Sequence, residues 1–178
     1  MLFRSNDARV GVKLKIVFVK DYNVSKAQTI IPAADLSEQI STAGTEASGT
    51  SNMKFALNGA LTVGTRDGAN VEIGEHTGED NIFFFGKTKA ELDDLNHHGY
   101  NPQSLIDSDK RLRRALEFVR DETPFGDLAR DVLERGDYWR IAADFADYWD
   151  KQESARSLYM NQPETWLTKS IINARADR

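Results

Sequence analysis

The sequence predicts an α/β layer in its first half and a set of helices in its second half. Three short apolar segments, residues 14–19, 61–65 and 82–85, have the length and the β-branched or aromatic content of buried strands. Stretches with helical spacing separate these segments, and strands that alternate with short helices are typical of a parallel sheet. From residue 88 onward, apolar positions recur at helical spacing between charged faces, so helices are expected there.

The first predicted connection is a helix at residues 24–31. Ser25 lies near its start, and Pro32 limits its end because proline lacks the amide hydrogen that a helix interior needs. Residues 37–52 are rich in serine, threonine and glycine, and this composition predicts a loop.

A compact helix is predicted at residues 52–58, with Gly59 as its stop. The turn Asp67-Gly68 then leads into a helical turn at residues 71–75. A helical segment is therefore expected between each pair of successive strands.

The second half contains four segments with apolar residues at helical spacing: 89–96, 104–120, 125–134 and 138–159. The predicted domain organisation is a leader at 1–13, an α/β segment at 14–87, and a helical part of the same domain at 88–178. An apparently helical run continues to the last residues, so we expect that the sequence belongs to a longer protein.

The three tryptophans and three histidines are given structural roles. Trp139, Trp149 and Trp166 lie in helical patterns, and core packing is the favoured interpretation over a sugar-stacking platform. His76, His97 and His98 are interpreted as surface or structural residues, because no cysteine or carboxylate spacing supports a zinc site.

Composition excludes several classes of protein. Of the 178 residues, 40% are hydrophobic and 29% are charged, which is the balance of an ordinary globular protein. The absence of cysteine excludes disulfides and thiolate metal sites, and a net charge of −5 gives no electrostatic footprint for nucleic acid. No apolar run approaches the roughly 20 residues that cross a bilayer. A soluble cytoplasmic protein is therefore expected.

The segment at residues 46–55 carries the chemistry. The small residues Ser48, Gly49 and Thr50 let backbone amides approach an anion, and the following helix presents its free amides to the same point. Lys54 lies about one turn inside that helix, and a lysine amine beside an aldehyde can form a Schiff base where its pKa is lowered. On composition alone, a plain turn with a surface lysine is the commoner interpretation.

The sequence around this segment resembles the α-glucan (glycogen, starch and maltodextrin) phosphorylase family. The likeness lies in residues 31–41, 46–50, 52–54, 57–62 and 67–72, and it is strong from about Leu14 to Gly86. It implies a Rossmann-like half of the C-terminal domain of a two-domain GT-B glycosyltransferase fold, followed by helices. It also implies phosphorolysis of α-1,4-glucan by inorganic phosphate, which yields glucose 1-phosphate with retention at the anomeric carbon.

The resemblance further implies a cofactor, pyridoxal 5′-phosphate. Lys54 matches the lysine that anchors the cofactor, and Gly49 and Thr50 match contacts to its phosphate, which acts as an acid/base partner of the inorganic phosphate. Tyr22 matches an aromatic residue beside the cofactor. The segment that binds the glucosyl hydroxyls corresponds to Glu46, Ala47, Ser48 and Gly49. For a full-length member, the resemblance implies a homodimer.

Two positions depart from the family pattern. Ser51 stands where many members have glycine, so its side chain either adds a hydrogen bond or crowds the backbone if φ is positive. Asn23 stands where some members have arginine, which removes a positive charge near the phosphate. The family's other phosphate-binding lysine and arginine residues precede this segment, so we expect no phosphorolysis from the chain alone.

Two other functions remain open at this level. The first is a glycosyltransferase half-domain that uses a sugar nucleotide, and a cofactor-binding assay separates it from a phosphorylase. The second is a non-catalytic module that binds glucan or phosphate, whose oligosaccharide binding would survive Lys54→Ala.

Overall fold

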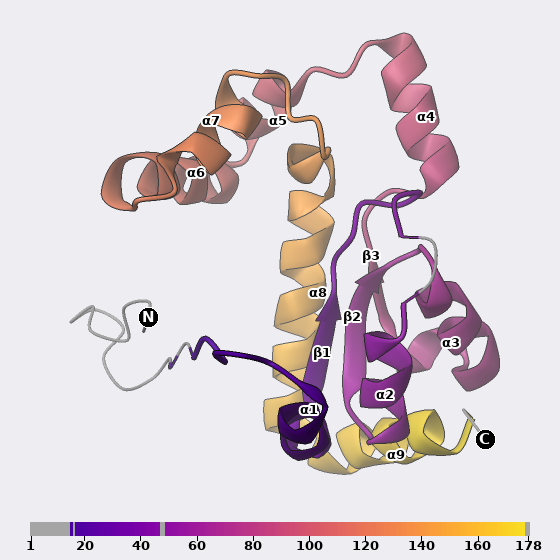
Figure 1. The fold of residues 1–178 in the computed structure, drawn as a ribbon. Coiled ribbons are helices and arrows are strands. Elements are labelled where there is room, and N and C mark those ends of the chain that lie inside the picture. The colour runs from indigo at the N-terminus through magenta and orange to yellow at the C-terminus, as the bar shows by residue number, and fades with distance from the viewer. Residues whose placement is uncertain (1–14, 16, 47–48, 177–178) are drawn as a thin grey trace. The chain divides into compact units, whose positions relative to one another are not determined.

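The computed structural model describes residues 15, 17–46 and 49–176 (Figure 1). The chain divides between Ala33 and Ala34 into two compact units. The described part of the first unit contains α1 (Val24–Ile30) and the short 3₁₀ helix η1 (Ile31–Ala33). The helix predicted here is confirmed, but its cap is Asn23, whose side chain accepts a hydrogen bond from the Lys26 amide.

The described residues of the segment at 14–19 do not form the predicted strand. Lys15 and residues 17–19 have no strand structure, while Leu14 and Ile16 lie outside the described residues. Val17 is 58% exposed and Phe18 is 70% exposed. Apolar, β-branched content favours a strand only where a neighbouring strand supplies hydrogen bonds and a packed face, so this prediction was wrong for these residues.

The second unit is built on a parallel sheet in the order β1 (Leu36–Gln39), β2 (Leu61–Thr65), β3 (Phe83–Phe85). Both pairs of neighbouring strands, β1–β2 and β2–β3, run parallel, as predicted. Helices α2 (Ser51–Leu57) and α3 (Ala69–Thr77) form the two crossovers. Both cover one face of the sheet, and the long helix α8 (Ile141–Asn161) covers the other (Figure 1).

Three of the four residues of strand β1 lie in the segment at 37–52 that was predicted to be a loop. Its residues are mostly polar, and local composition therefore gives no strand signal. The strand is held by its ladder with β2 and by α8, from which Tyr148 Oη and Gln152 Nε2 each donate to the Glu38 carboxylate at 2.9 Å. Long-range contacts override propensity here.

The two faces of the sheet have separate cores. Leu61, Val63 and Phe85 pack with Ala155 and Trp166 on the α8 side. On the opposite side, the buried core consists of Ala56, Ile73, Ile82 and Phe84. Successive phenylalanines of β3 thus face opposite ways, as the two-residue period of a strand requires.

Every described element after Gly86 is helical. The helices are α4 (Lys89–His98), α5 (Pro102–Ser108), α6 (Lys110–Glu122), α7 (Gly126–Leu133), α8 and α9 (Pro163–Ala176). A third core joins α5, α6, α7 and the start of α8 through Ile106, Leu112, Leu116, Ala129, Val132 and Ala142. No helix in the described ranges has the length and apolarity that crossing a membrane requires.

The helix predicted at 104–120 is in fact two helices, separated at Asp109. The Asp109 carboxylate accepts the amides of Arg111 at 2.8 Å and Leu112 at 3.4 Å, so it caps a new helix. Aspartate favours this role because its oxygen satisfies amides that have no partner within the helix.

This cap predicts an acid-sensitive contribution to stability. The hydrogen bond from the Arg111 guanidinium holds the pKa of Asp109 at about 2, below the ordinary 3.8. Because the folded-state pKa is depressed, the contribution is present above pH 3.8 and is lost as the pH falls toward 2. In Asp109→Asn, the free energy of unfolding is therefore expected to fall less steeply between pH 3.8 and about pH 2 than in the unmodified chain. Urea unfolding at a series of pH values measures this slope. An unchanged slope would contradict the assignment.

The tryptophans differ in burial. Trp166 is 5% exposed and lies in the core beneath the sheet, as predicted. Trp149 is 42% exposed and Trp139 is 54% exposed, so the prediction of core packing was wrong for both. Trp139 lies in the loop before α8, because that helix begins at Ile141 instead of near Tyr138.

Helix α9 closes the amino edge of the sheet. Ser170 Oγ donates to the Gly59 carbonyl at 2.7 Å, just before β2, and Asn173 Nδ2 donates to the Asn81 carbonyl at 3.0 Å, just before β3. The carboxyl edge lies at the opposite end of the strands (Figure 1).

Candidate functional site

The candidate site lies at the carboxyl edge of the sheet, where the segments that follow the parallel strands come together. Open α/β sheets commonly bind their ligands at this edge. Here the loop that follows β1 is fastened to the end of β2, because Thr65 Oγ1 donates to the Ser41 carbonyl at 2.7 Å.

Asp67 fixes the loop that carries Glu46. One carboxylate oxygen, Oδ2, accepts the amides of Thr45 at 3.2 Å and Glu46 at 2.9 Å. The Glu46 side chain lies across the same loop, with Oε2 accepting from Ser41 Oγ at 3.3 Å. Glu46 is exposed, and its backbone is held at the end of β2.

A buried pair of asparagines joins the starts of α2 and α3. Asn52 Nδ2 donates to Asn70 Oδ1 at 2.9 Å, and Asn70 Nδ2 donates to the Thr65 carbonyl at 3.0 Å. The side chains are only 3% and 4% exposed. Sequence reasoning assigned no role to this pair, although each asparagine stands in a segment that resembles the phosphorylases, and a buried amide is a signal because it needs partners.

These residues enclose a cavity of about 20 Å³, lined by Gln39, Ser41, Glu46, Gly49, Asn52, Thr65, Asp67 and Asn70. Gly49 approaches Asn52 closely, since a Cβ at that position would lie 2.9 Å from Asn52 Oδ1. The volume suits about one water molecule.

The predicted site residues of the second unit are partly brought together. Glu46 and Gly49 share the cavity, whereas Ala47 and Ser48 lie outside the described residues. Thr50 immediately precedes α2, and its side chain makes no capping hydrogen bond.

Lys54 lies on the exposed face of α2. The buried face of this helix carries Asn52 and Ala56, so Lys54 shares the outer face with Ser51, one turn away. No carboxylate among the described residues forms an ion pair with Lys54. The described residues therefore leave this amine accessible instead of enclosing it.

The structure accommodates Ser51 and Asn23, the two residues that depart from the family pattern. Ser51 is the first residue of α2 and has a helical backbone, and its Oγ donates to Gln39 Oε1 at 3.2 Å. A hydrogen bond is thus added without a positive φ. In the first unit, Asn23 caps α1, and the neighbouring Tyr22 is 59% exposed.

The histidines lie on helix surfaces, as predicted. Nδ1 of each ring lies within 3.0 Å of a carbonyl oxygen one turn earlier in its helix, Glu72 for His76, Asp93 for His97 and Asp94 for His98. Within the described ranges, no group of three histidine, cysteine or acidic side chains is placed to hold a metal ion.

Comparison with known proteins identifies the family. Residues 4–177 match the family model described as carbohydrate phosphorylase. The chain belongs to the carbohydrate phosphorylase family. It is 48% identical over 177 residues to the muscle form of glycogen phosphorylase from Homo sapiens, and 46% identical over 176 residues to glycogen phosphorylase from Pasteurella multocida. Each alignment covers 95% of this chain.

The matched region is a small part of each related phosphorylase. This chain spans 21% of the human and Pasteurella proteins, and 19% of the glycogen phosphorylase from Saccharomyces cerevisiae, to which it is 47% identical over 177 residues. The match extends through the helical second half, where the resemblance read from the motifs was weaker.

Proposed function

We propose that this chain is the cofactor-carrying part of a glycogen phosphorylase, an enzyme that cleaves α-1,4-glucan with inorganic phosphate to give glucose 1-phosphate. Family membership supports this function. One structural observation supports the assignment of the site residues: Glu46, Gly49 and the start of α2 lie together at the carboxyl edge of a parallel sheet. The fold of the full-length protein is then the two-domain GT-B fold, to which this chain contributes a Rossmann-like half.

The residues present fit pyridoxal 5′-phosphate. Gly49 has no Cβ, which lets its backbone lie close to the Asn52 side chain at the start of α2, and the Thr50 side chain makes no capping hydrogen bond. The next residues begin α2, where the amides of Ser51 and Asn52 precede the first backbone hydrogen bond of the helix and favour an anion, while the Met53 amide already donates to Asn52 Oδ1 at 2.9 Å. Lys54 is one turn further along, exposed and without an ion pair among the described residues, so its amine is accessible to an aldehyde.

In this proposal, one group of residues binds the cofactor and another binds the glucosyl unit. Gly49 and Thr50 hold the cofactor phosphate and Lys54 anchors the cofactor, which supplies through its phosphate an acid/base partner for the attacking inorganic phosphate. Glu46, with Ala47 and Ser48, binds glucosyl hydroxyls, because carboxylate oxygens accept hydrogen bonds from hydroxyls and repel phosphate. Asp67 positions Glu46 through its two backbone hydrogen bonds.

The exposure of Lys54 has a consequence for the full-length protein. Closing a binding site excludes water and so protects reactive groups from hydrolysis. Other parts of a full-length phosphorylase are therefore proposed to enclose Lys54 and to supply the cationic residues that bind inorganic phosphate. Tyr22 is proposed to pack beside the cofactor. We also propose a cytoplasmic homodimer for the full-length protein.

The isolated chain is expected to release no glucose 1-phosphate from glycogen or maltodextrin. The reason is that the family's other phosphate-binding residues precede this segment, and Arg4 and Arg9, which lie before the first predicted strand, match none of those positions. The measurement is a coupled assay for glucose 1-phosphate with purified chain, pyridoxal 5′-phosphate and inorganic phosphate. Turnover by the purified chain would contradict this prediction.

A chimera tests the proposed function directly. The matching 177 residues of the human muscle enzyme are replaced by this chain, and phosphorolysis of glycogen is measured. The chimera is expected to be active and to lose activity on Lys54→Ala, while Lys110→Ala, at an exposed lysine of α6, retains it. A folded chimera whose activity is unaffected by Lys54→Ala would overturn the proposal.

A further inference from the structure

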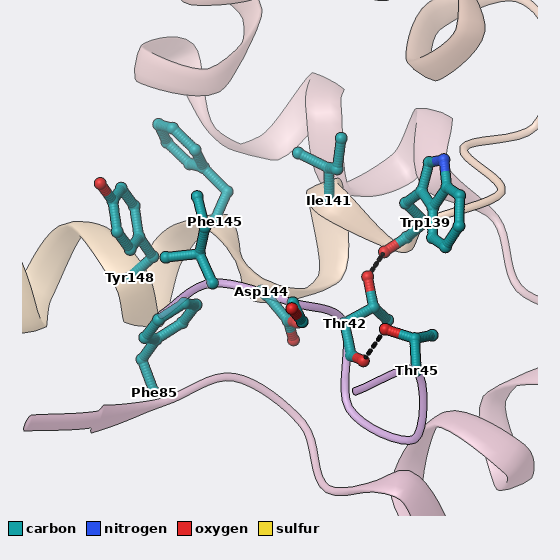
Figure 2. Close-up of a pocket in the computed structure, with 10 residues that line it drawn as sticks. Thr42, Thr45, Phe85, Trp139, Ile141, Asp144, Phe145 and Tyr148 are labelled. Atoms are coloured by element: carbon teal, nitrogen blue, oxygen red, sulfur yellow. Dashed lines mark hydrogen bonds between the residues drawn. The ribbon is translucent and has the colours of Figure 1, made fainter. Parts of the chain in front are cut away.

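A second and much larger cavity lies on the other side of the loop that follows β1. Its volume is about 640 Å³, and it lies between that loop, the end of β3 and the start of α8. Figure 2 shows Phe85, Phe145 and Tyr148 along one side and Trp139 toward the other, with Asp144 between them. A cavity of this size with a mainly apolar lining and few polar groups is typical of a small-molecule site.

Asp144 is the notable polar group of this cavity. Asp144 is only 9% exposed, and its Oδ1 accepts a hydrogen bond from the Lys87 amide at 2.8 Å. Within the part of the chain that the structure describes, no basic nitrogen forms an ion pair with this carboxylate, and Oδ2 has no hydrogen-bond donor. The Lys87 ammonium acts on Asp144 through its charge but forms no ion pair with it, so a bound cation in contact with the carboxylate would stabilise it further.

The electrostatic surroundings agree with this geometry. Burial raises the pKa of Asp144, and this effect outweighs the opposing influence of the Lys87 amide and ammonium. The negative charges of Asp147 and Asp137 act in the same direction as burial. The negative charges of these two neighbouring carboxylates favour positive charge near Asp144.

The hydroxyl groups nearby are already engaged. Thr42 Oγ1 donates to the Trp139 carbonyl at 2.9 Å, and Thr45 Oγ1 donates to the Thr42 carbonyl at 2.6 Å (Figure 2). Tyr148 Oη donates to Glu38. Few donors remain to bind an anion or the several hydroxyls of a sugar, whereas aromatic faces and one carboxylate suit a cation with an apolar body.

We propose that this cavity binds a small organic cation, a primary ammonium carried on an aromatic or cyclic apolar group. The ammonium lies against Asp144, and the apolar group packs among Phe85, Phe145 and Tyr148. Charge-assisted hydrogen bonds of this kind are about twice as strong as neutral ones. The site involves neither Lys54 nor the cofactor, so its test is independent of the proposed phosphorylase function.

The probes are three molecules that share an aromatic ring and differ in charge. 2-Phenylethylamine, 2-phenylethanol and 3-phenylpropionate are titrated into the chain and followed by calorimetry and ligand-observed NMR. The amine is expected to bind at least tenfold more tightly than the alcohol, a difference of about 1.4 kcal/mol. The anion is expected to bind more weakly than either. Equal affinity for amine and alcohol, or no saturable binding of the amine at millimolar concentration, would overturn the proposal.

Matched variants locate the effect. Asp144→Asn keeps an acceptor for the Lys87 amide but removes the charge, so amine affinity is expected to fall about tenfold, to the level of the alcohol. Asp127→Asn removes an exposed carboxylate of α7, which pairs with Arg130 and does not line the cavity, and amine affinity is expected to change less than about twofold. Equal losses in the two variants would contradict a specific site.

A third variant keeps the test decisive if Asp144→Asn fails to fold. Ile141→Phe adds volume to a side chain that lines the cavity and is 45% exposed, without changing any charge. Both the amine and the alcohol are expected to lose binding while the circular dichroism spectrum is retained. Unchanged binding of the amine would show that the ligand lies elsewhere.

Discussion

Replacing Trp166 with alanine is expected to lower the free energy of unfolding of the second unit by about 4 kcal/mol. The indole is 5% exposed and packs with Leu61 and Val63 beneath the sheet. Its ring stacks on Phe83 at 6.2 Å between centroids and meets Tyr159 edge-on at 5.0 Å. Truncation therefore leaves a cavity between α9, α8 and the sheet that the surrounding elements cannot readily fill.

Trp149→Ala is the matched control for this substitution. Trp149 is 42% exposed, and its ring contacts the Arg111 guanidinium, 5.2 Å from the ring centroid, and the Phe145 ring, 6.1 Å between centroids. An exposed cation–π contact contributes about 0.5–1 kcal/mol, so the loss is expected to be several times smaller. Both values come from urea unfolding followed by circular dichroism. Similar losses for the two tryptophans would contradict the position of Trp166 in the core.

Asp137→Ala is expected to cost about 3 kcal/mol, because a single buried carboxylate organises the start of α8. Asp137 is 1% exposed and accepts hydrogen bonds from Tyr100 Oη at 2.7 Å, the Ile141 amide at 2.9 Å and the Ala142 amide at 2.8 Å. Its φ of +50° is a conformation that aspartate tolerates better than alanine, which adds to the cost.

Conservative variants separate these contributions. Tyr100→Phe removes one donor to the carboxylate and is expected to cost about 1 kcal/mol. Asp137→Asn retains an acceptor and the positive φ, so its cost should lie between those of the other two variants. A double-mutant cycle between Tyr100 and Asp137 measures their coupling free energy. A cost for Asp137→Ala no larger than that for Tyr100→Phe would show that the two amides do not depend on this carboxylate.

The sequence predicted elements well where local pattern and tertiary structure agree. Strand β2 was predicted with its observed limits, since its five residues are apolar or β-branched and entirely buried. Strand β1 was missed because Glu38 is bound by Tyr148 and Gln152, which are more than 100 residues away in sequence. The start of α8 was placed too early because Asp137 and Arg140 have positive φ, which local periodicity does not reveal.

The candidate site was likewise predictable only in part. Motif resemblance singled out Glu46 and Gly49, and the fold brings both to one cavity. The roles of Asn52 and Asn70 could not be predicted from spacing, since their side chains meet only after two crossovers have formed. Exposure of Lys54 was likewise not predictable, because it depends on which face of α2 packs against the sheet.

The most direct test of the proposed function is to map where pyridoxal 5′-phosphate attaches to this chain. The folded chain is incubated with a low concentration of the cofactor, reduced with borohydride and digested, and the labelled peptides are identified by mass. Lys54→Ala and Lys110→Ala are treated in parallel to separate specific from general lysine reactivity. We expect the label mainly on the peptide that contains Lys54, lost in Lys54→Ala and retained in Lys110→Ala. Label spread over exposed lysines, in an amount that Lys54→Ala does not change, would contradict the assignment of Lys54 as the cofactor anchor.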